Sequence, residues 1–197
     1  MKAIPAAHPL RHLFRRVTRA AVDSTGMRRD PDIELHISEE ILARFVHIDN
    51  LYRIRNVRGK RLTEIAEILL EADAGHMTGI SDEVLFHEYI GDYALFMTGI
   101  FPASVRRTAR VPSGHDHLLM KFGSLFLPFD DPVDYYVAQG RAAYAKASEL
   151  SRPFRPHRAM VLRELANRFE SFVALMGLIA AYLEADPYFR KAKGIIS

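Results

Sequence analysis

The sequence predicts an all-α fold: a single-domain bundle of five to seven helices, mostly antiparallel, with one long C-terminal helix. Apolar residues recur at helical spacing through most of the chain, and capping residues, glycines or prolines end each run. Strand-like alternation is confined to residues 33–37, a short stretch without an obvious pairing partner. The chain of 197 residues, 49% hydrophobic and 26% charged, has the length and composition of one globular domain.

The first predicted helix is a basic amphipathic one over residues 9–22. Its apolar face is Leu10, Leu13, Phe14, Val17 and Ala21, and its polar face carries Arg11, Arg15, Arg16 and Arg19. We therefore divide the chain into a basic N-terminal segment, 1–32, and a single helical domain, 33–197. Such a helix can lie on an anionic membrane surface. The acidic block 61–101 offers it a complementary protein surface, so docking onto its own bundle or onto a second copy is the expectation.

The next three helices follow from caps and periodicity. Ser38 is a suitable N-cap for a helix that ends near Gly59. A third helix is predicted over residues 62–74. The fourth, over residues 82–98, is apolar on nearly every side, which predicts a central position in the bundle.

The C-terminal half is read from proline and capping signals. Residues 103–129 predict little beyond one short helix around 117–126. Asp131 followed by Pro132 is an acidic N-cap with proline at the first helical position, and it opens a helix that reaches about residue 150. The long last helix is predicted over residues 157–183.

The fourth helix carries a polar stripe formed by His87, Glu88, Gly91 and Asp92. It predicts either a solvent-facing surface with Gly91 as a packing notch, or a buried network in which an Arg or Tyr hydroxyl bonds Asp92. A third interpretation is a metal site of His87, Glu88 and Asp92. Di-iron bundles repeat a Glu-x-x-His motif on two helices, and this motif is absent, so no metal is expected. Gly91 itself predicts a close helix crossing, because glycine is unfavourable within a helix.

The helix after Pro132 is rich in small residues and carries Tyr135, Tyr136 and Tyr144. Core packing is its main interpretation, since small residues let helices approach closely. Together with Asp92, the three tyrosines are also candidates for a small-molecule site, because tyrosine hydroxyls reach polar partners beyond an apolar core. His115 and His117 form a second polar cluster with too few ligands for a metal site.

The composition excludes several classes of protein. The chain has no Cys, hence neither a disulfide framework nor a thiolate metal site. The longest apolar run, residues 172–183, is too short to cross a bilayer, and arginines interrupt the first 22 residues. We therefore expect a cytoplasmic protein. The net charge is only +3, and the basic runs 53–61 and 106–110 lack a neighbouring recognition helix, so nucleic acid is not an expected partner.

Two blocks of the C-terminal half resemble a protein family. GDYALFMTGIFP at residues 91–102 and VDYYVAQGRAAY at 133–144 are similar to segments of a family of uncharacterised bacterial helical proteins of about this length. The segment LRELANRFESFVALMGLI at 162–179 fits the same pattern. The resemblance implies a bacterial, cytoplasmic, helical protein, and no activity comes with it. Residues 1–32 lie outside the match.

No catalytic signature is present: nucleophile elbow, phosphate-binding loop and dinucleotide fingerprint are all missing. We therefore expect no cofactor, and the catalytic residues of any enzyme function remain unassigned. The sequence favours a non-catalytic helical interaction or regulatory protein that binds a protein partner or itself. The alternative is a small-molecule- or metal-binding bundle, which includes an enzyme, with its site near Asp92 and the helix bearing Tyr135 and Tyr136.

Overall fold

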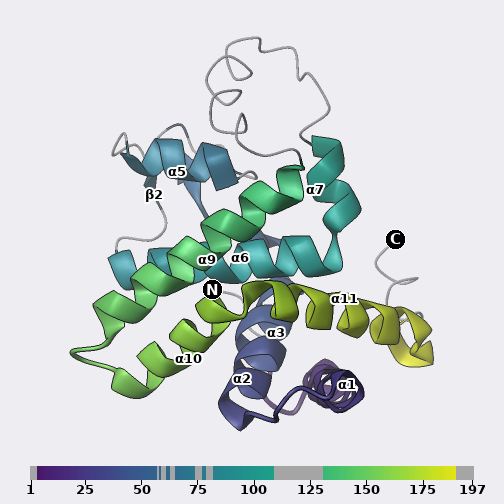
Figure 1. Cartoon of the computed structure of the whole chain (residues 1–197). Helices are drawn as coiled ribbons and strands as arrows, with labels where there is room; N and C mark the ends of the chain where they lie inside the picture. The colour runs from purple at the N-terminus through teal and green to yellow at the C-terminus, as the bar shows by residue number, and fades with distance from the viewer. Residues whose placement is uncertain are drawn as a thin grey trace.

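The computed structural model describes residues 4–56, 58, 61–62, 65–73, 77–78, 82–108 and 131–189, and within them the fold is all-α (Figure 1). The α-helices are α1 (Pro9–Thr25), α2 (Pro31–Leu35), α3 (Ala43–Phe45), α4 (Ile48–Leu51), α5 (Ile65–Asp73), α6 (Glu83–Ile100), α7 (Pro102–Thr108), α9 (Pro132–Ser151), α10 (Pro156–Asn167) and α11 (Phe169–Ala185), and the π-helix is η1 (His36–Leu42). The strands β1 (Arg55–Asn56) and β2 (Met77–Thr78) form one short antiparallel pair. Within these ranges, every helix is too short or too polar to cross a bilayer.

Helix α6 is the centre of the bundle, as its apolar composition predicts. Residues 88–99 are buried at every position. Helix α9 packs across one side of α6 and α11 packs on another, while α10 returns beside α9 (Figure 1). Small residues make these crossings close, since a Cβ at Gly140 of α9 would lie 2.4 Å from the Phe169 ring of α11.

Helix α1 docks on the rest of the chain through its predicted apolar face. The buried residues of α1 are Leu13, Phe14, Val17, Thr18, Ala21 and Val22. They pack against α11 and η1, and Arg16 forms an ion pair with Asp186 just beyond α11. Docking of α1 onto the rest of the chain is therefore confirmed, but the acidic block 61–101 was the wrong surface, because the described ion pairs of the α1 arginines are with Glu34, Glu39 and Asp186. The division of the chain at residue 32 stays a prediction.

The second helix begins earlier than predicted. Asp30 caps α2 by accepting hydrogen bonds from the backbone N–H groups of Asp32 and Ile33, at 3.0 and 3.3 Å, and Pro31 is the first helical residue. Ser38 was the wrong N-cap: it is 1% exposed inside η1. The helical run continues from α2 through η1 to α3, with the wider hydrogen bonding of a π-helix from the backbone N–H of Ala43 to the carbonyl of Ser38.

The single long C-terminal helix is also wrong, because the chain turns at Arg168 between α10 and α11. The two halves pack on different partners: α10 on α9, and α11 on α6 and α1. The change of direction lets Phe169 reach the core, where it is fully buried. Periodicity continues across the break, so the sequence pattern does not reveal it.

The count of five to seven helices needs the same correction, since the described residues hold ten α-helices and one π-helix. The additional ones are short segments, such as α3 and α4, that periodicity merges into longer helices. Helix α7 lies at the start of the range 103–129 that the sequence left open. The predicted short helix at 117–126, with His117, falls outside the described residues, and so does His115.

Candidate functional site

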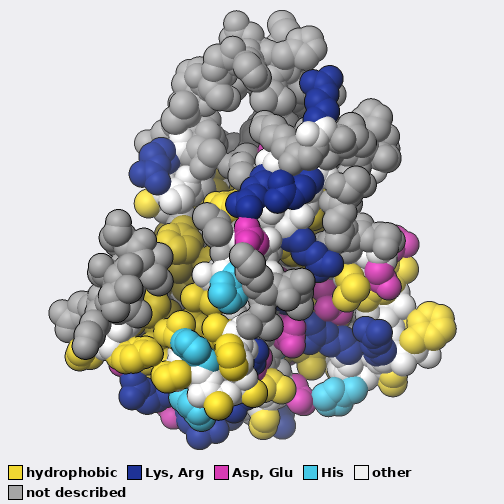
Figure 2. All heavy atoms as spheres, turned by 180° about the vertical axis from the view of Figure 1, so that it is seen from behind, with side chains coloured by type: hydrophobic (Ala, Val, Ile, Leu, Met, Phe, Trp, Pro, Cys, Tyr) yellow, Lys and Arg dark blue, Asp and Glu magenta, His cyan; other side chains and the backbone are white. Residues whose placement is uncertain are grey.

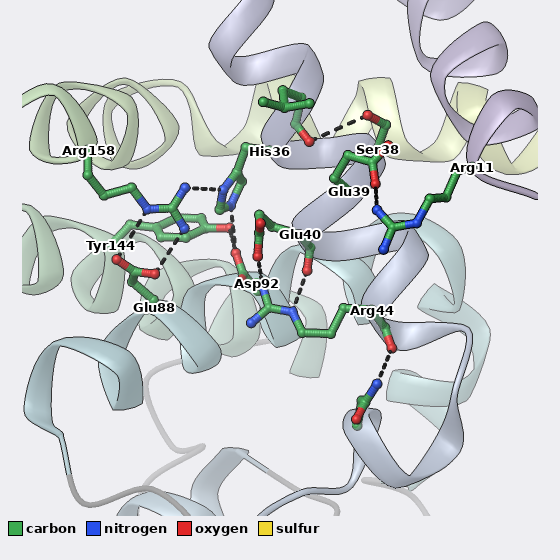
Figure 3. Close-up of polar contacts among 12 residues, drawn as sticks. Arg11, His36, Ser38, Glu39, Glu40, Arg44, Glu88, Asp92, Tyr144 and Arg158 are labelled. Carbon is green, nitrogen blue, oxygen red and sulfur yellow. Dashed lines mark hydrogen bonds and ion pairs between the residues drawn. The ribbon is translucent and has the colours of Figure 1, made fainter. Parts of the chain in front are cut away.

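Asp92, at the middle of α6, is the centre of a buried polar network (Figure 3). Its carboxylate is completely buried, and three side chains from other elements contact it. Oδ1 accepts the Tyr144 hydroxyl of α9 at 2.7 Å and lies 2.7 Å from Nε2 of His36 of η1. Oδ2 accepts a hydrogen bond from Nη2 of Arg44, in α3. One carboxylate therefore joins four elements.

His36 extends this network toward α10. Nη1 of Arg158 lies 2.9 Å from Nδ1 of His36, on the side of the ring opposite Asp92. A guanidinium only donates, so Nδ1 must accept, and Nε2 then carries the proton that is donated to Asp92. The two neighbours thus assign one neutral tautomer to His36, which is 2% exposed.

Arg158 in turn pairs with Glu88, one helical turn before Asp92 on α6. The pair is bidentate: Nε donates to Oε1 at 3.3 Å and Nη2 donates to Oε2 at 2.9 Å. Glu88 is only 6% exposed. We call these six side chains the core network; its members are His36, Arg44, Glu88, Asp92, Tyr144 and Arg158.

Gly91 leaves room for the Tyr144 ring to approach Asp92, because glycine has no side chain. A Cβ at Gly91 would lie 2.4 Å from Cδ1 of Tyr144, well inside van der Waals contact. The tyrosine ring therefore lies flat on the helix backbone, and its hydroxyl reaches the adjacent carboxylate. This confirms the predicted close crossing and identifies α9 as the crossing helix.

The network fixes the charges of its members. Burial by itself would raise the pKa of Asp92, but the Arg44 guanidinium, His36 and the Tyr144 hydroxyl outweigh it, and the pKa falls from 3.8 to about 2. Burial, followed by the charge of Asp92, holds the pKa of Tyr144 well above its ordinary value. Burial acts to lower the pKa of Arg158, but the hydrogen bonds and charge of Glu88 outweigh burial, so the pKa lies above its ordinary value. At neutral pH Asp92 is thus an anion and Tyr144 a neutral donor.

This arrangement resembles a catalytic His–Asp pair only in part. In such pairs the carboxylate orients one imidazole nitrogen while the other faces a nucleophile. Here the second nitrogen of His36 accepts from Arg158, and both faces of the ring are buried. The geometry instead links η1, α3, α6, α9 and α10 through matched donors and acceptors.

The interpretation of the polar stripe as a buried network is confirmed for Glu88, Gly91 and Asp92, and the solvent-facing one is wrong for them. Both predicted partner types of Asp92, an Arg and a Tyr hydroxyl, are present. His87 lies apart: its side chain is 22% exposed and Nε2 is 3.9 Å from Glu83. Burial lowers the pKa of His87.

The metal and small-molecule candidates are distributed over separate contacts. His87, Glu88 and Asp92 have different partners, and the described part of the chain holds no group of three or more His, Asp or Glu arranged for a metal ion. Of the tyrosines, Tyr144 contacts Asp92, whereas Tyr135 and Tyr136 are buried with their rings 6.3 Å apart and Tyr136 against Tyr93.

Sequence reasoning missed His36, Arg44 and Arg158. His36 lies in the stretch that looks strand-like, and Arg158 follows a proline-rich turn, so neither stands out locally. They meet α6 across 56, 48 and 70 residues of sequence. A lone buried acid on an apolar helix does signal that cationic partners exist, although it does not name them.

Two surface hollows among the described residues adjoin α2, and Asp92 lines neither. One, of about 430 Å³, lies between the connection from α1 to α2 and the helices α10 and α11. The other, of about 520 Å³, lies between α1 and α2. Protein-family models, curated proteins and solved structures yield no match to this chain.

Proposed function

We propose that this protein is a non-catalytic helical interaction protein that binds an acidic protein partner through the turn between α9 and α10. The observation that carries the proposal is Phe154, which is 84% exposed at that turn. The turn lies at one end of the molecule, where the α9–α10 hairpin projects (Figure 1).

The surroundings of Phe154 favour a partner over plain solvent exposure. Arg152 and Arg155 flank it, both exposed, and neither guanidinium has a hydrogen bond or ion pair with the part of the chain that the structure describes. Met160, on the next turns of α10, is 71% exposed. Exposed aromatic and arginine side chains are the residue types that anchor protein interfaces. An apolar pocket rimmed by carboxylates is the surface that fits them.

The core network supports the non-catalytic part of the proposal. Its charged groups pair with one another, and Asp92 lines neither of the two hollows described above. The alternative, a small-molecule or metal site near Asp92 and the helix of Tyr135 and Tyr136, is less well supported, because protein donors already occupy Asp92.

A photo-crosslinking residue at position 154 tests the proposal in the native host. We expect one discrete crosslinked species, identified by mass spectrometry as an acidic protein; a crosslink only to a second copy of this chain, whose net charge is +3, would contradict an acidic partner. The matched control is the same residue at Tyr188, an aromatic side chain that is 48% exposed near the C-terminus. Replacing Arg152 and Arg155 by Glu should reduce the yield several-fold, because the rim charges steer association. A yield from position 154 no higher than that from 188 refutes the proposal.

A further inference from the structure

The hollow between α1 and α2 has a cationic wall that the proposed function does not use. Its volume is about 520 Å³. Its lining residues are Arg15, Arg19, Arg29, Pro31, Glu34, Leu35 and Ser38. Arg15 and Arg19 lie one helical turn apart on α1, and Arg29 comes from the connection to α2. Three guanidinium groups, two from α1 and one from the connection to α2, therefore line the same hollow.

The charges of this hollow do not cancel. Glu34 is its single acid: it accepts two hydrogen bonds from Arg29, at 3.1 and 3.3 Å, and lies 3.8 Å from Nε of Arg19. The lining residues alone thus have a net charge of +2, and the wider cluster that includes Arg11, Asp23 and Glu39 has a net charge of +1. Two further acids reach these arginines from outside it. Glu39 accepts from Nε of Arg15 at 2.6 Å and also pairs with Arg11 (Figure 3), and Asp23 lies 3.6 Å from Arg29.

Donors remain after these pairings. The Nη atoms of Arg15 and Arg19 donate no hydrogen bond to the described residues, and the shortest contact of each side chain with a carboxylate is made by Nε. Their side chains are 55% and 67% exposed, so an incoming ligand can reach them. The forked geometry of a guanidinium matches the oxygens of a phosphoryl group. Leu35, 51% exposed, adds an apolar wall beside them.

We propose that this hollow binds a phosphoryl group, with Arg15, Arg19 and Arg29 as its ligands. A phosphate monoester fits best: its charged oxygens accept hydrogen bonds from the Nη donors of Arg15 and Arg19, and the body of the ester lies against Leu35 and Pro31. The phosphoryl group has two chemical sources, a soluble phosphate ester or the headgroup of an anionic lipid. The same three arginines serve either source.

Calorimetric titration of the full chain at constant ionic strength tests this proposal, with inorganic phosphate and glycerol phosphate as soluble probes. The informative variant is Arg19→Gln. Its matched control is Arg16→Gln, on the same helix and 68% exposed against 67% for Arg19, but outside the hollow. We expect Arg19→Gln to weaken binding about tenfold or more, the effect of one lost charged contact, and Arg16→Gln to change it less than about twofold.

Vesicles distinguish the two sources. Flotation with vesicles containing phosphatidic acid, lost in Arg19→Gln and absent on phosphatidylcholine alone, assigns the site to a lipid headgroup; titration heat with the soluble probes and no flotation assigns it to a free ester. The proposal is overturned if neither probe nor phosphatidic acid vesicles bind. It is equally overturned if the two variants weaken binding alike, since that is the signature of unspecific attraction to a basic helix.

Discussion

Two clusters of arginines and carboxylates join helices in this protein, and they differ in what surrounds them. In the core network, Asp92 is fully buried, and both of its carboxylate oxygens accept hydrogen bonds from side chains of other elements. The α1 arginine cluster is formed by Arg11, Arg15, Arg19, Asp23, Arg29, Glu34 and Glu39. Its four arginines outnumber its three carboxylates, and most of the arginine side chains are exposed. The same pairing chemistry therefore organises the fold in one place and leaves capacity for a ligand in the other.

The physical reason is the cost of removing charge from water. A buried charge that loses its partner has no solvent to replace it, whereas an exposed arginine simply rehydrates. Buried ion pairs add little net stability compared with a well-packed apolar core, but they penalise every arrangement that leaves one member unmatched. We infer that the core network selects the register in which α9 and α10 meet α6. The following predictions test this difference.

The largest effect is expected from Asp92→Ala. It leaves the Arg44 guanidinium, the His36 N–H and the Tyr144 hydroxyl without their acceptor, so we expect a loss of about 3–5 kcal/mol in the free energy of unfolding. The matched control is Asp23→Ala, whose carboxylate is 54% exposed and 3.6 Å from Arg29; it should change stability by less than about 0.5 kcal/mol. Urea unfolding measures both variants, and equal losses would erase the distinction between the two clusters.

Acid should weaken the stabilising contribution of Asp92 in the core network. The folded-state pKa of Asp92 is about 2, below its ordinary 3.8. The folded protein thus binds this proton less readily than the unfolded chain. The resulting stabilisation is complete above about pH 4, is lost as the pH falls toward 2, and is on the order of 2 kcal/mol.

The isosteric variant Asp92→Asn isolates this contribution. Its amide does not titrate, so the stability difference from the parent should shrink between pH 5 and pH 2. Urea unfolding at several pH values measures the difference. A difference that stays constant over this range would show that Asp92 is not the group responsible.

The backbone crossing beneath the core network gives the next prediction. Gly91→Ala places a methyl group 2.4 Å from the Tyr144 ring, which its hydrogen bond to Asp92 prevents from moving aside. We expect a destabilisation of about 1–3 kcal/mol from overpacking. Gly177→Ala in α11 is the control, because its nearest neighbour is the Gly99 carbonyl at 3.7 Å. That variant should be neutral, or more stable by up to about 1 kcal/mol through helix propensity. Thermal unfolding of both decides whether the loss comes from the contact with Tyr144 rather than from adding a methyl group to any helical glycine.

The sequence predicted the half of the site that lies on one helix. Gly91 and Asp92 stood out because a packing glycine and an acid interrupt an apolar run, and that local contrast was sufficient to predict burial and the type of partner. The partners themselves depend on long-range packing. Residue types and periodicity describe one helix at a time, so they do not determine which of 27 basic residues reaches Asp92.

The same limit explains the outcome for the helices. Asp131 followed by Pro132 correctly predicted the start of α9, and Asp30 followed by Pro31 is the same signal at α2, where Ser38 was preferred instead. The turn at Arg168 depends on which neighbours α10 and α11 contact, and periodicity alone does not contain that information. All-α architecture was predictable because it is the sum of local signals.

The smallest effect is expected where an ion pair joins helices at the surface. Arg141 of α9 pairs with Glu170 of α11, with side chains 47% and 70% exposed. Arg158 and Glu88 join α10 to α6 with the same residue types at 26% and 8% exposure.

Double-mutant cycles with Arg→Gln and Glu→Gln give the coupling energy of each pair, free of the separate cost of each substitution. We expect about 0.2–1 kcal/mol for Arg141–Glu170, falling in 1 M salt, because water screens both groups. The Arg158–Glu88 coupling should be larger and should change little with salt, since Glu88 has almost no access to water. Equal couplings that fall together in salt would mean that Glu88 is hydrated in solution and that burial does not separate the two pairs.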